Sequence, residues 1–194
     1  MDPIDNGACK NCVIFGVGEW RALWYDPTYP WDKDWGFLEK LMRQMDFNEG
    51  WIQLIMGCVK TVSYSVLVNR EPCGMIWPTR GIRQGDSLSP FLLLLCIERL
   101  NGLIKRAENN REIHGFSQCR RGPKLTHLLF AYDSLLFCRA TMEECDKVLE
   151  ILNMYEDASG QKVNRNKTAL FFSKCTPRET RHEIKVAFGV PKIM

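Results

Sequence analysis

The sequence lacks the long apolar run that a membrane-spanning helix requires. Its longest uninterrupted apolar run, Phe91 to Ile97, is closed by Pro90 and Glu98, whereas a spanning helix needs about 20 apolar residues. The first residues carry an acid rather than a cluster of bases, and no long apolar stretch follows them, so we expect no secretory signal. These absences favour a nuclear or cytoplasmic protein that is not secreted and has no membrane partner.

Regularly spaced cysteines and a strong net charge are also missing. The nine cysteines show no repeating spacing, which is typical of a reducing compartment rather than of a secreted disulfide framework. Cys9 and Cys12 form one C-x-x-C pair, but a zinc site needs about four ligands and no second pair stands at finger spacing, so we predict no zinc there. The net charge of +3 is weak for a dedicated nucleic-acid binder, and the chain has the composition of one globular domain.

Apolar periodicity and capping residues predict several helices. Asn48 is expected to cap the second of two consecutive helices, and Ser89 is expected to cap a long buried helix. Thr141 and Glu144 have the spacing of a capping box at the start of a third long helix. Gly160 follows the third long helix as a stop signal. The predicted helical segments are 35–45, 49–60, 89–106, 142–159 and a short one ending near 189.

Period-two alternation predicts strands between these helices. Residues 61–69 alternate as a half-buried strand, 72–74 are expected to turn the chain, and 75–77 to return as its partner. Residues 127–137 form two short apolar strands around Tyr132 and Asp133, which we expect at or near a hairpin tip. With a further strand at 168–173, the pattern predicts an α+β fold, an antiparallel sheet with helices packed on one face.

Three segments resemble the reverse transcriptase domain of non-LTR retrotransposons, particularly the LINE-type elements abundant in plant genomes. They read RGIRQGDSLSP over 80–90, HLLFAYDSLLF over 127–137 and SGQKVNRNK over 159–167. The resemblance implies a truncated and degenerate copy, in which residues 25–194 form part of a palm and the fingers and thumb are missing. Residues 1–24 resemble no segment of that family and stay unassigned.

The resemblance implies that catalysis would depend on a cluster of aspartates. Nucleotidyl transfer uses two divalent metals about 4 Å apart, here Mg²⁺ by resemblance, and carboxylates supply their ligands. The family turn commonly reads Phe-Ala-Asp-Asp, whereas this chain has Tyr132 in place of the first Asp and keeps Asp133. A neutral phenol cannot replace that charged ligand, and a lone Asp in a turn is also a common turn-former, so both roles stay open for Asp133.

A third aspartate is expected on an early strand, for which Asp26 is the candidate. Asp26 and Asp32 keep the six-residue separation of the two aspartates in the family pattern. Pro27 and Pro30 argue against the assignment, because proline interrupts the hydrogen-bond ladder of a strand. Asp26 is therefore a weak candidate for catalysis and for metal binding.

Substrate contacts are implied for two further motifs. The loop of Arg83, Gln84 and Gly85 would lie against the incoming nucleotide and template, since glycine allows close approach and glutamine offers a donor and an acceptor. Lys167 matches a lysine that approaches the triphosphate, although a surface lysine beside a strand is an equal alternative. Arg165 and Lys162 could add to the same positive field.

The resemblance thus implies a protein descended from an RNA-directed DNA polymerase, and the replacement of an aspartate by Tyr132 predicts that it is now catalytically inactive. Its implied partners are an RNA or DNA template-primer and a deoxynucleoside triphosphate. The alternative is a non-catalytic module that binds nucleic acid or protein through the retained palm surface.

Overall fold

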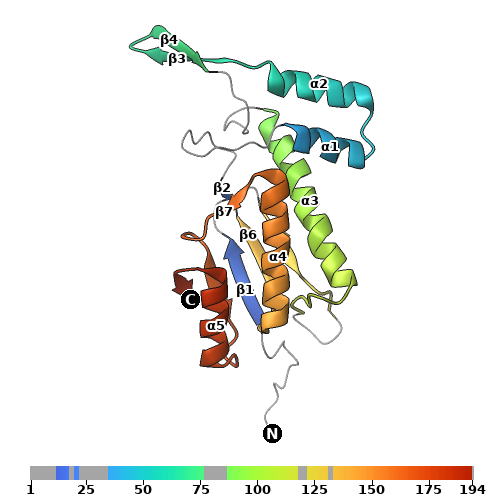
Figure 1. The fold of residues 1–194 in the computed structure, drawn as a ribbon, viewed down its shortest axis with the longest axis vertical. Coiled ribbons are helices and arrows are strands. Elements are labelled where there is room, and N and C mark those ends of the chain that lie inside the picture. Colours follow the sequence, from blue (N-terminus) through green and yellow to red (C-terminus); the bar gives the residue numbers. More distant parts are fainter. Residues whose placement is uncertain are drawn as a thin grey trace.

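The computed structural model describes residues 12–17, 20–21, 35–76, 87–117, 122–130 and 133–193. A sheet layer with three helices forms one end of the molecule, and a helix pair with a separate hairpin forms the other end (Figure 1). The predicted α+β class with antiparallel pairing is confirmed. No helix in the described ranges is long and apolar enough to cross a membrane.

The main sheet has five strands in the order β5-β6-β1-β8-β9. All neighbours are antiparallel except β8 and β9, which run parallel. The strands are β1 Cys12–Val17, β5 His127–Leu129, β6 Ser134–Arg139, β8 Ala169–Phe172 and β9 Lys192–Ile193. The central strand β1 comes from the segment that the sequence left unassigned, and Cys12 of the C-x-x-C pair is its first residue, whereas Cys9 lies outside the described residues.

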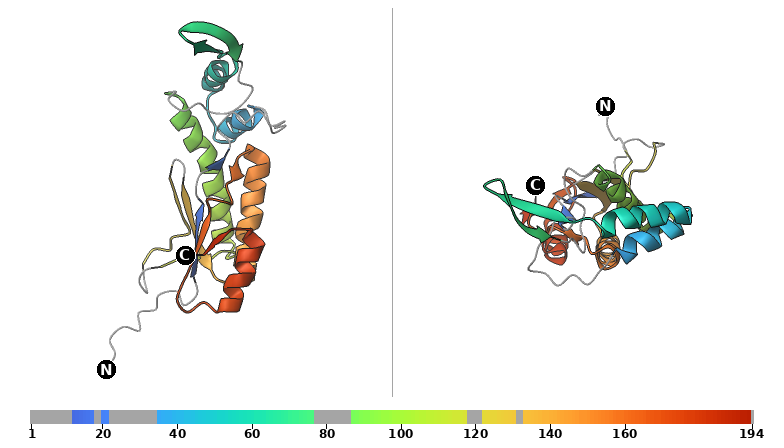
Figure 2. Two further views of the ribbon diagram at one scale, coloured as in Figure 1. Left: turned by 90° about the vertical axis from the view of Figure 1, so that its left-hand side faces the viewer. Right: turned by 90° about the horizontal axis from the view of Figure 1, so that it is seen from above.

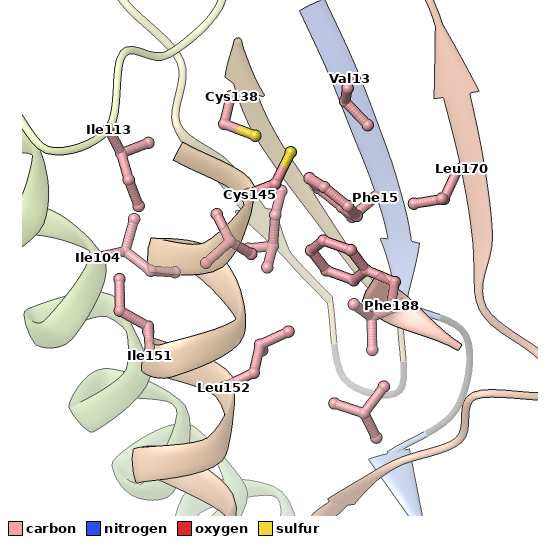
Figure 3. Close-up of a cluster of buried hydrophobic side chains, with 14 of the residues drawn as sticks. Val13, Phe15, Ile104, Ile113, Cys138, Cys145, Ile151, Leu152, Leu170 and Phe188 are labelled. Atoms are coloured by element: carbon pink, nitrogen blue, oxygen red, sulfur yellow. The ribbon is translucent and has the colours of Figure 1, made fainter. Parts of the chain in front are cut away.

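Three helices cover one face of this sheet, as Figure 2 shows. They are α3 Ser89–Asn109, α4 Met142–Ser159 and α5 Arg178–Phe188. Every second residue of β1 points toward the helices: Val13, Phe15 and Val17 are almost completely buried. The ring of Phe15 stacks on that of Phe188 with centroids 4.2 Å apart, and Figure 3 shows the two rings within the core. Because residues of one strand alternate between faces, this buried triplet fixes the register of the whole sheet.

Helix ends follow local capping chemistry. The Asn48 side chain accepts a hydrogen bond from Gly50 N, and the Thr141 side chain accepts one from Glu144 N. Gly160 ends α4 with a φ of 74°, where an L side chain would be strained. The expected Ser89 cap is wrong by one residue: Leu88 occupies the N-cap position of α3, so Ser89 is already helical and Pro90 lies in the first turn. Helix boundaries commonly differ by this much.

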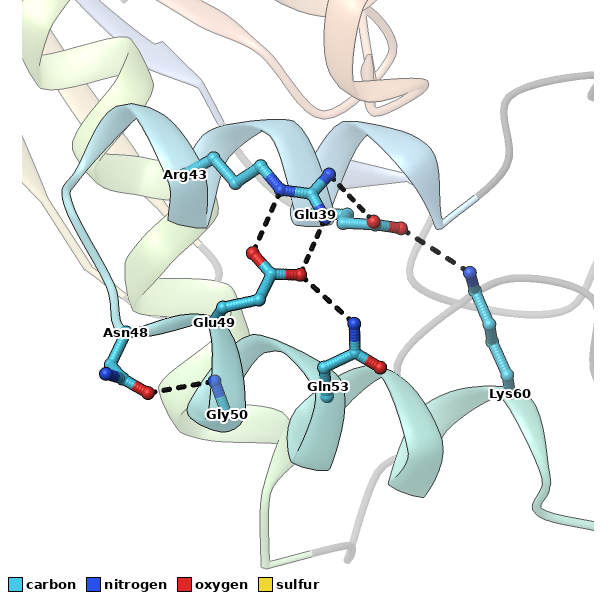
Figure 4. A network of polar contacts seen from close by, with 7 residues as sticks. All are labelled: Glu39, Arg43, Asn48, Glu49, Gly50, Gln53 and Lys60. Atoms are coloured by element: carbon cyan, nitrogen blue, oxygen red, sulfur yellow. Dashed lines mark hydrogen bonds and ion pairs between the residues drawn. The ribbon is translucent and has the colours of Figure 1, made fainter.

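The helix pair is α1 Gly36–Gln44 and α2 Glu49–Lys60. Both helices pack on the N-terminal half of α3 through a second buried cluster that includes Met42, Ile52 and Leu92. A polar network joins their exposed sides (Figure 4): the Arg43 guanidinium bridges Glu39 and Glu49 at 2.8 and 2.9 Å. Helix α3 therefore belongs to both cores, since its C-terminal half packs against the sheet.

The hairpin of β3 Tyr64–Val68 and β4 Glu71–Ile76 differs from the prediction in two ways. First, the chain turns at Asn69 and Arg70, with φ values of 51° and 71°, and not at 72–74. Asparagine tolerates the positive φ that a two-residue hairpin turn requires. Second, the strand is exposed rather than half-buried, since Val66, Leu67 and Val68 all lie in solvent.

Another two-stranded sheet pairs β2 Trp20–Arg21 with β7 Lys162–Val163.

Candidate functional site

The predicted hairpin around Tyr132 and Asp133 is present. Strands β5 and β6 pair antiparallel, with Leu129 opposite Ser134. Phe130 N donates to Asp133 O at 2.8 Å, so a backbone hydrogen bond joins the two sides of the hairpin beyond the last strand pair. Asp133 is exposed and stands immediately before β6, so the structure confirms its position beside the hairpin tip. Tyr132 lies outside the described residues.

The end of β1 lies beside this turn. Val17, the last residue of β1, is opposite Ser134, and Gly16 is opposite Leu135 on one side and Ala169 on the other. The strand next to the hairpin is thus built from residues 12–17. Asp26, which the resemblance would place on such a strand, lies outside the described residues.

A chain of side-chain hydrogen bonds connects the hairpin to α3. The His127 ring on β5 contacts Asn101 Oδ1 through Nε2 at 3.0 Å and Thr126 Oγ1 through Nδ1 at 3.0 Å. Asn101 in turn donates to Glu98. Burial and the positive charge of Lys105 lower the pKa of His127, against smaller opposite effects of Glu108 and Glu98. The neutral ring is therefore the favoured form in the folded protein, and it holds the hairpin against the helix.

In the segment from Ser159 to Lys167, Arg165 and Lys162 bind other parts of the fold. Arg165 Nη1 donates to Phe188 O at 2.8 Å, at the carbonyl end of α5, where a cation is favourable. Lys162 forms an ion pair with Glu156 at 3.2 Å. Lys167 is exposed at the turn before β8, and its backbone N donates to Asn164 O. Of the three bases expected to create a positive field, Lys167 has the most exposed position.

Sequence reasoning missed the role of Gln161 in this segment. Gln161 is buried, and its Oε1 accepts from the Tyr155 hydroxyl at 2.6 Å. Burial raises the pKa of the Tyr155 phenol well above its usual range, so the phenol stays a donor. Tyr155 sits at helical spacing in the predicted α4, which marks it as buried, but its partner comes from beyond the helix and leaves no periodic signal.

A second charged cluster lies at the other end of β6. The Glu144 carboxylate accepts from the backbone N atoms of His114 and Arg139 at 2.9 and 3.0 Å and contacts His114 Nδ1 at 2.9 Å. The capping box is thus half confirmed: Thr141 caps α4, whereas the Glu144 carboxylate binds other segments. An open depression here is lined by Arg111, Glu112, Arg139, Thr141, Glu143, Glu144 and Lys147. Its positive and negative side chains balance, so it shows no preference for an anion or a cation.

The predicted substrate loop of Arg83, Gln84 and Gly85 lies outside the described residues, as Asp26 and Tyr132 do. Asp133 and Lys167 are the predicted site residues that the structure places. Within the described ranges, no group of three or more His, Cys, Asp or Glu side chains could hold a metal ion. Asp133 is therefore the one predicted metal ligand whose position is defined.

The hairpin and most of the elements around it lie in a region that matches a known protein family. Residues 31–186, more than half of the chain, match the family described as reverse transcriptase (RNA-dependent DNA polymerase). The chain belongs to this reverse transcriptase family. The matched region of the chain contains Tyr132 and Asp133, the Arg83 segment and Lys167. Asp26 and strand β1 precede this region.

A curated protein of Arabidopsis thaliana, the uncharacterized mitochondrial protein AtMg01250, is similar to part of the chain. The two are 44% identical over 68 residues, which is 35% of this chain and 56% of that protein. The chain thus spans little more than half the length of this relative.

Proposed function

We propose that β1, β5, β6 and β8, with α3 and α4, form the palm of a LINE-type reverse transcriptase, and that this copy no longer catalyses nucleotidyl transfer. The order strand, helix, strand, strand, helix, strand supports the palm, with both helices on one face of the sheet. The three family-like segments of the sequence support the LINE-type origin.

One observation carries the proposal of inactivity: the turn between β5 and β6 has Tyr132 and Asp133 where the family pattern has two aspartates. Two shared metals about 4 Å apart need several carboxylate oxygens in close proximity. A phenol with a pKa near 10 is neutral and supplies no such charge. Asp133 and, by resemblance, Asp26 are the acidic residues left to hold Mg²⁺, and the described residues contain no acidic cluster around Asp133. A neutral Tyr132 beside Asp133 therefore does not supply the charge that a two-metal site needs at this turn.

Binding of template-primer and nucleotide is a separate part of the proposal. Arg83, Gln84 and Gly85 would contact nucleotide and template, and Lys167 would approach the triphosphate. The exposure of Lys167 beside β8 supports this role for the lysine. The other contacts rest on the family-like sequence of their loop.

The test is extension of a labelled primer on an RNA template with Mg²⁺ or Mn²⁺. We expect no extension by the wild type and none by Tyr132→Asp, because that substitution leaves the proline-flanked Asp26 unchanged. Loss of metal placement costs several kcal/mol of barrier lowering, and each 1.4 kcal/mol is about a tenfold change in rate. An intact reverse transcriptase of the same family is the positive control. Metal-dependent extension by the wild type would overturn the inactive assignment, and extension by the variant alone would make Tyr132 the single lesion.

A second candidate, binding of nucleic acid without catalysis, is favoured by the exposed ring of Phe130. This residue is 55% exposed directly beside the turn, and an exposed aromatic ring can stack on an unpaired base for about 1–3 kcal/mol. We expect a salt-dependent gel shift on single-stranded RNA that Phe130→Ala weakens about fivefold or more. Phe91→Ala, on the 65% exposed ring of α3, is the matched control. Equal weakening by both variants, or no shift at low salt, rejects this candidate.

A further inference from the structure

The β3–β4 hairpin projects from the body of the molecule and pairs with no third strand among the described residues (Figures 1 and 2). Its apolar side chains lie in solvent: Val66, Leu67, Val68 and Met75 are 42, 65, 52 and 52% exposed. A two-stranded hairpin is marginally stable alone and is stabilised by a third strand or a covering helix. Exposed apolar strands of this kind mark a surface for strand addition.

The outer edge of β4 is poorly suited to accept another strand. Pro72, opposite Leu67, has no backbone N–H to donate. The register then shifts, so that Val66 lies opposite both Cys73 and Gly74, and Gly74 has a φ of 82°. A bulge of this kind bends its strand and interrupts the ladder. Both features are devices by which proteins prevent pairing at a sheet edge.

The outer edge of β3 has none of these protections. Its sequence YSVLV contains no charge, proline or glycine. Val68 and Glu71 flank the two-residue turn, and such a flanking pair exchanges hydrogen bonds in an antiparallel hairpin. Alternation along the regular strand then directs the backbone N–H and C=O groups of Ser65 and Leu67 outward. The edge therefore offers two residues that can pair with a further strand.

We propose that this chain forms a symmetric dimer in which β3 pairs antiparallel with β3 of a second copy, with the two-fold axis at Val66. In this register Ser65 of each copy lies opposite Leu67 of the other, so the outward backbone groups of both strands meet. Because β3 contains no charged residue, two copies of it can pair without charge repulsion, and an uncharged strand suits this edge better than a charged one. Because the β4 edges are blunted, the four-stranded sheet closes as a dimer and does not continue into a filament.

The dimer should be weak and concentration-dependent. One pair of short strands buries less surface than the roughly 1,600 Å² of a stable interface. The expected observation for the full chain is a sedimentation coefficient that rises with concentration toward that of a dimer. This inference does not depend on the proposed loss of catalysis, because β3 is separate from the β5–β6 turn.

The first test compares Leu67→Lys with Leu54→Lys by analytical ultracentrifugation. Leu54 on α2 is 58% exposed, so the two substitutions add the same charge at similarly exposed leucines. Leu67→Lys places two ammonium groups on one face of the dimer sheet and should raise the dissociation constant about tenfold or more. Leu54→Lys should leave it unchanged. A monomer at all concentrations, or equal weakening by both variants, would overturn the proposal.

The second test is disulfide crosslinking, which reports the register even if Leu67→Lys unfolds the hairpin. At the two-fold axis the Cα atoms of residue 66 in the two copies would lie about 4.5 Å apart, within disulfide reach. Val66→Cys is made in a Cys73→Ser background, as is its control, because Cys73 lies opposite residue 66 in the same hairpin. It should therefore yield a covalent dimer above the background of Cys73→Ser alone when air and a copper catalyst oxidise the thiols. Val68→Cys is the control, because its two copies would be roughly 13 Å apart, four residues of strand. Crosslinking of both variants alike, or of neither, contradicts the proposed register.

Discussion

Val17, the last residue of β1, pairs with Ser134, the first residue of β6. This pairing places the end of the central strand next to Asp133, which precedes β6 in the chain. The strand that neighbours the hairpin is therefore formed by residues 12–17, ahead of the region that matches the reverse transcriptase family. Any carboxylate that shares a metal with Asp133 must lie near this strand end, because both would bind the same ion.

The first prediction concerns the contribution of β1 to stability. Phe15→Ala removes a fully buried ring that stacks on Phe188, and it should lower the free energy of unfolding by about 3–5 kcal/mol. Ile14→Ala, on the opposite and less buried face of the same strand, should cost about half as much or less. Urea denaturation followed by circular dichroism measures both. Equal, small effects would show that β1 does not occupy the centre of the sheet.

The second prediction concerns the buried carboxylate of Glu144. Glu144→Ala leaves the backbone N–H groups of His114 and Arg139 without their acceptor, so it should destabilise the protein by about 2–4 kcal/mol. Glu143→Ala, at the exposed neighbouring position of the same helix turn, should cost about 0.5 kcal/mol, through the helix dipole. Thermal or urea unfolding of the two variants separates a structural carboxylate from a general effect of charge. Similar losses in both would contradict the assignment.

The third prediction is a pH dependence that arises from His127. Burial, the largest cause, lowers the pKa of this ring below its ordinary value of 6.5 in the folded state. The unfolded chain therefore binds the proton more readily, so the contribution of His127 to stability is complete above about pH 6.5 and decreases as the pH falls below it. The wild type should lose more thermal stability between pH 7.5 and about pH 5.5 than His127→Gln does.

The control for this pH dependence is His182→Gln, which removes an exposed histidine on α5. This variant should follow the wild-type profile. Lys105, Glu108 and Glu98 lie near His127 on α3, and the positive charge of Lys105 lowers the pKa of the ring. Lys105→Gln removes this charge, so the ring should protonate more readily in the folded state. The variant should therefore lose less stability than the wild type as the pH falls. A His127→Gln profile identical to that of the wild type would show that protonation of His127 does not contribute to the pH dependence of stability.

Local chemistry explains why much of the secondary structure could be predicted. Asn48, Thr141 and Gly160 act within one helical turn of their own positions, so the sequence alone determines where α2 and α4 begin or end. The β5–β6 hairpin likewise joins adjacent segments through a short turn. The motifs around this hairpin were sufficient to predict the family, because a family pattern is carried by residue types at fixed spacing.

Only the tertiary structure decided which segments meet. Residues 12–17 carry no family-like motif, and their place between β6 and β8 depends on partners more than 100 residues away along the chain. The same holds for the Glu144 carboxylate, which the capping spacing assigns to its own helix but which binds His114 from a distant loop. Alternation in 61–69 predicts the strand that the structure has at Tyr64–Val68. It does not predict the exposure of that strand, because burial depends on a covering layer elsewhere in the fold. Sequence thus determined local conformation and ancestry, whereas long-range packing decided strand order, burial and the partners of buried charges.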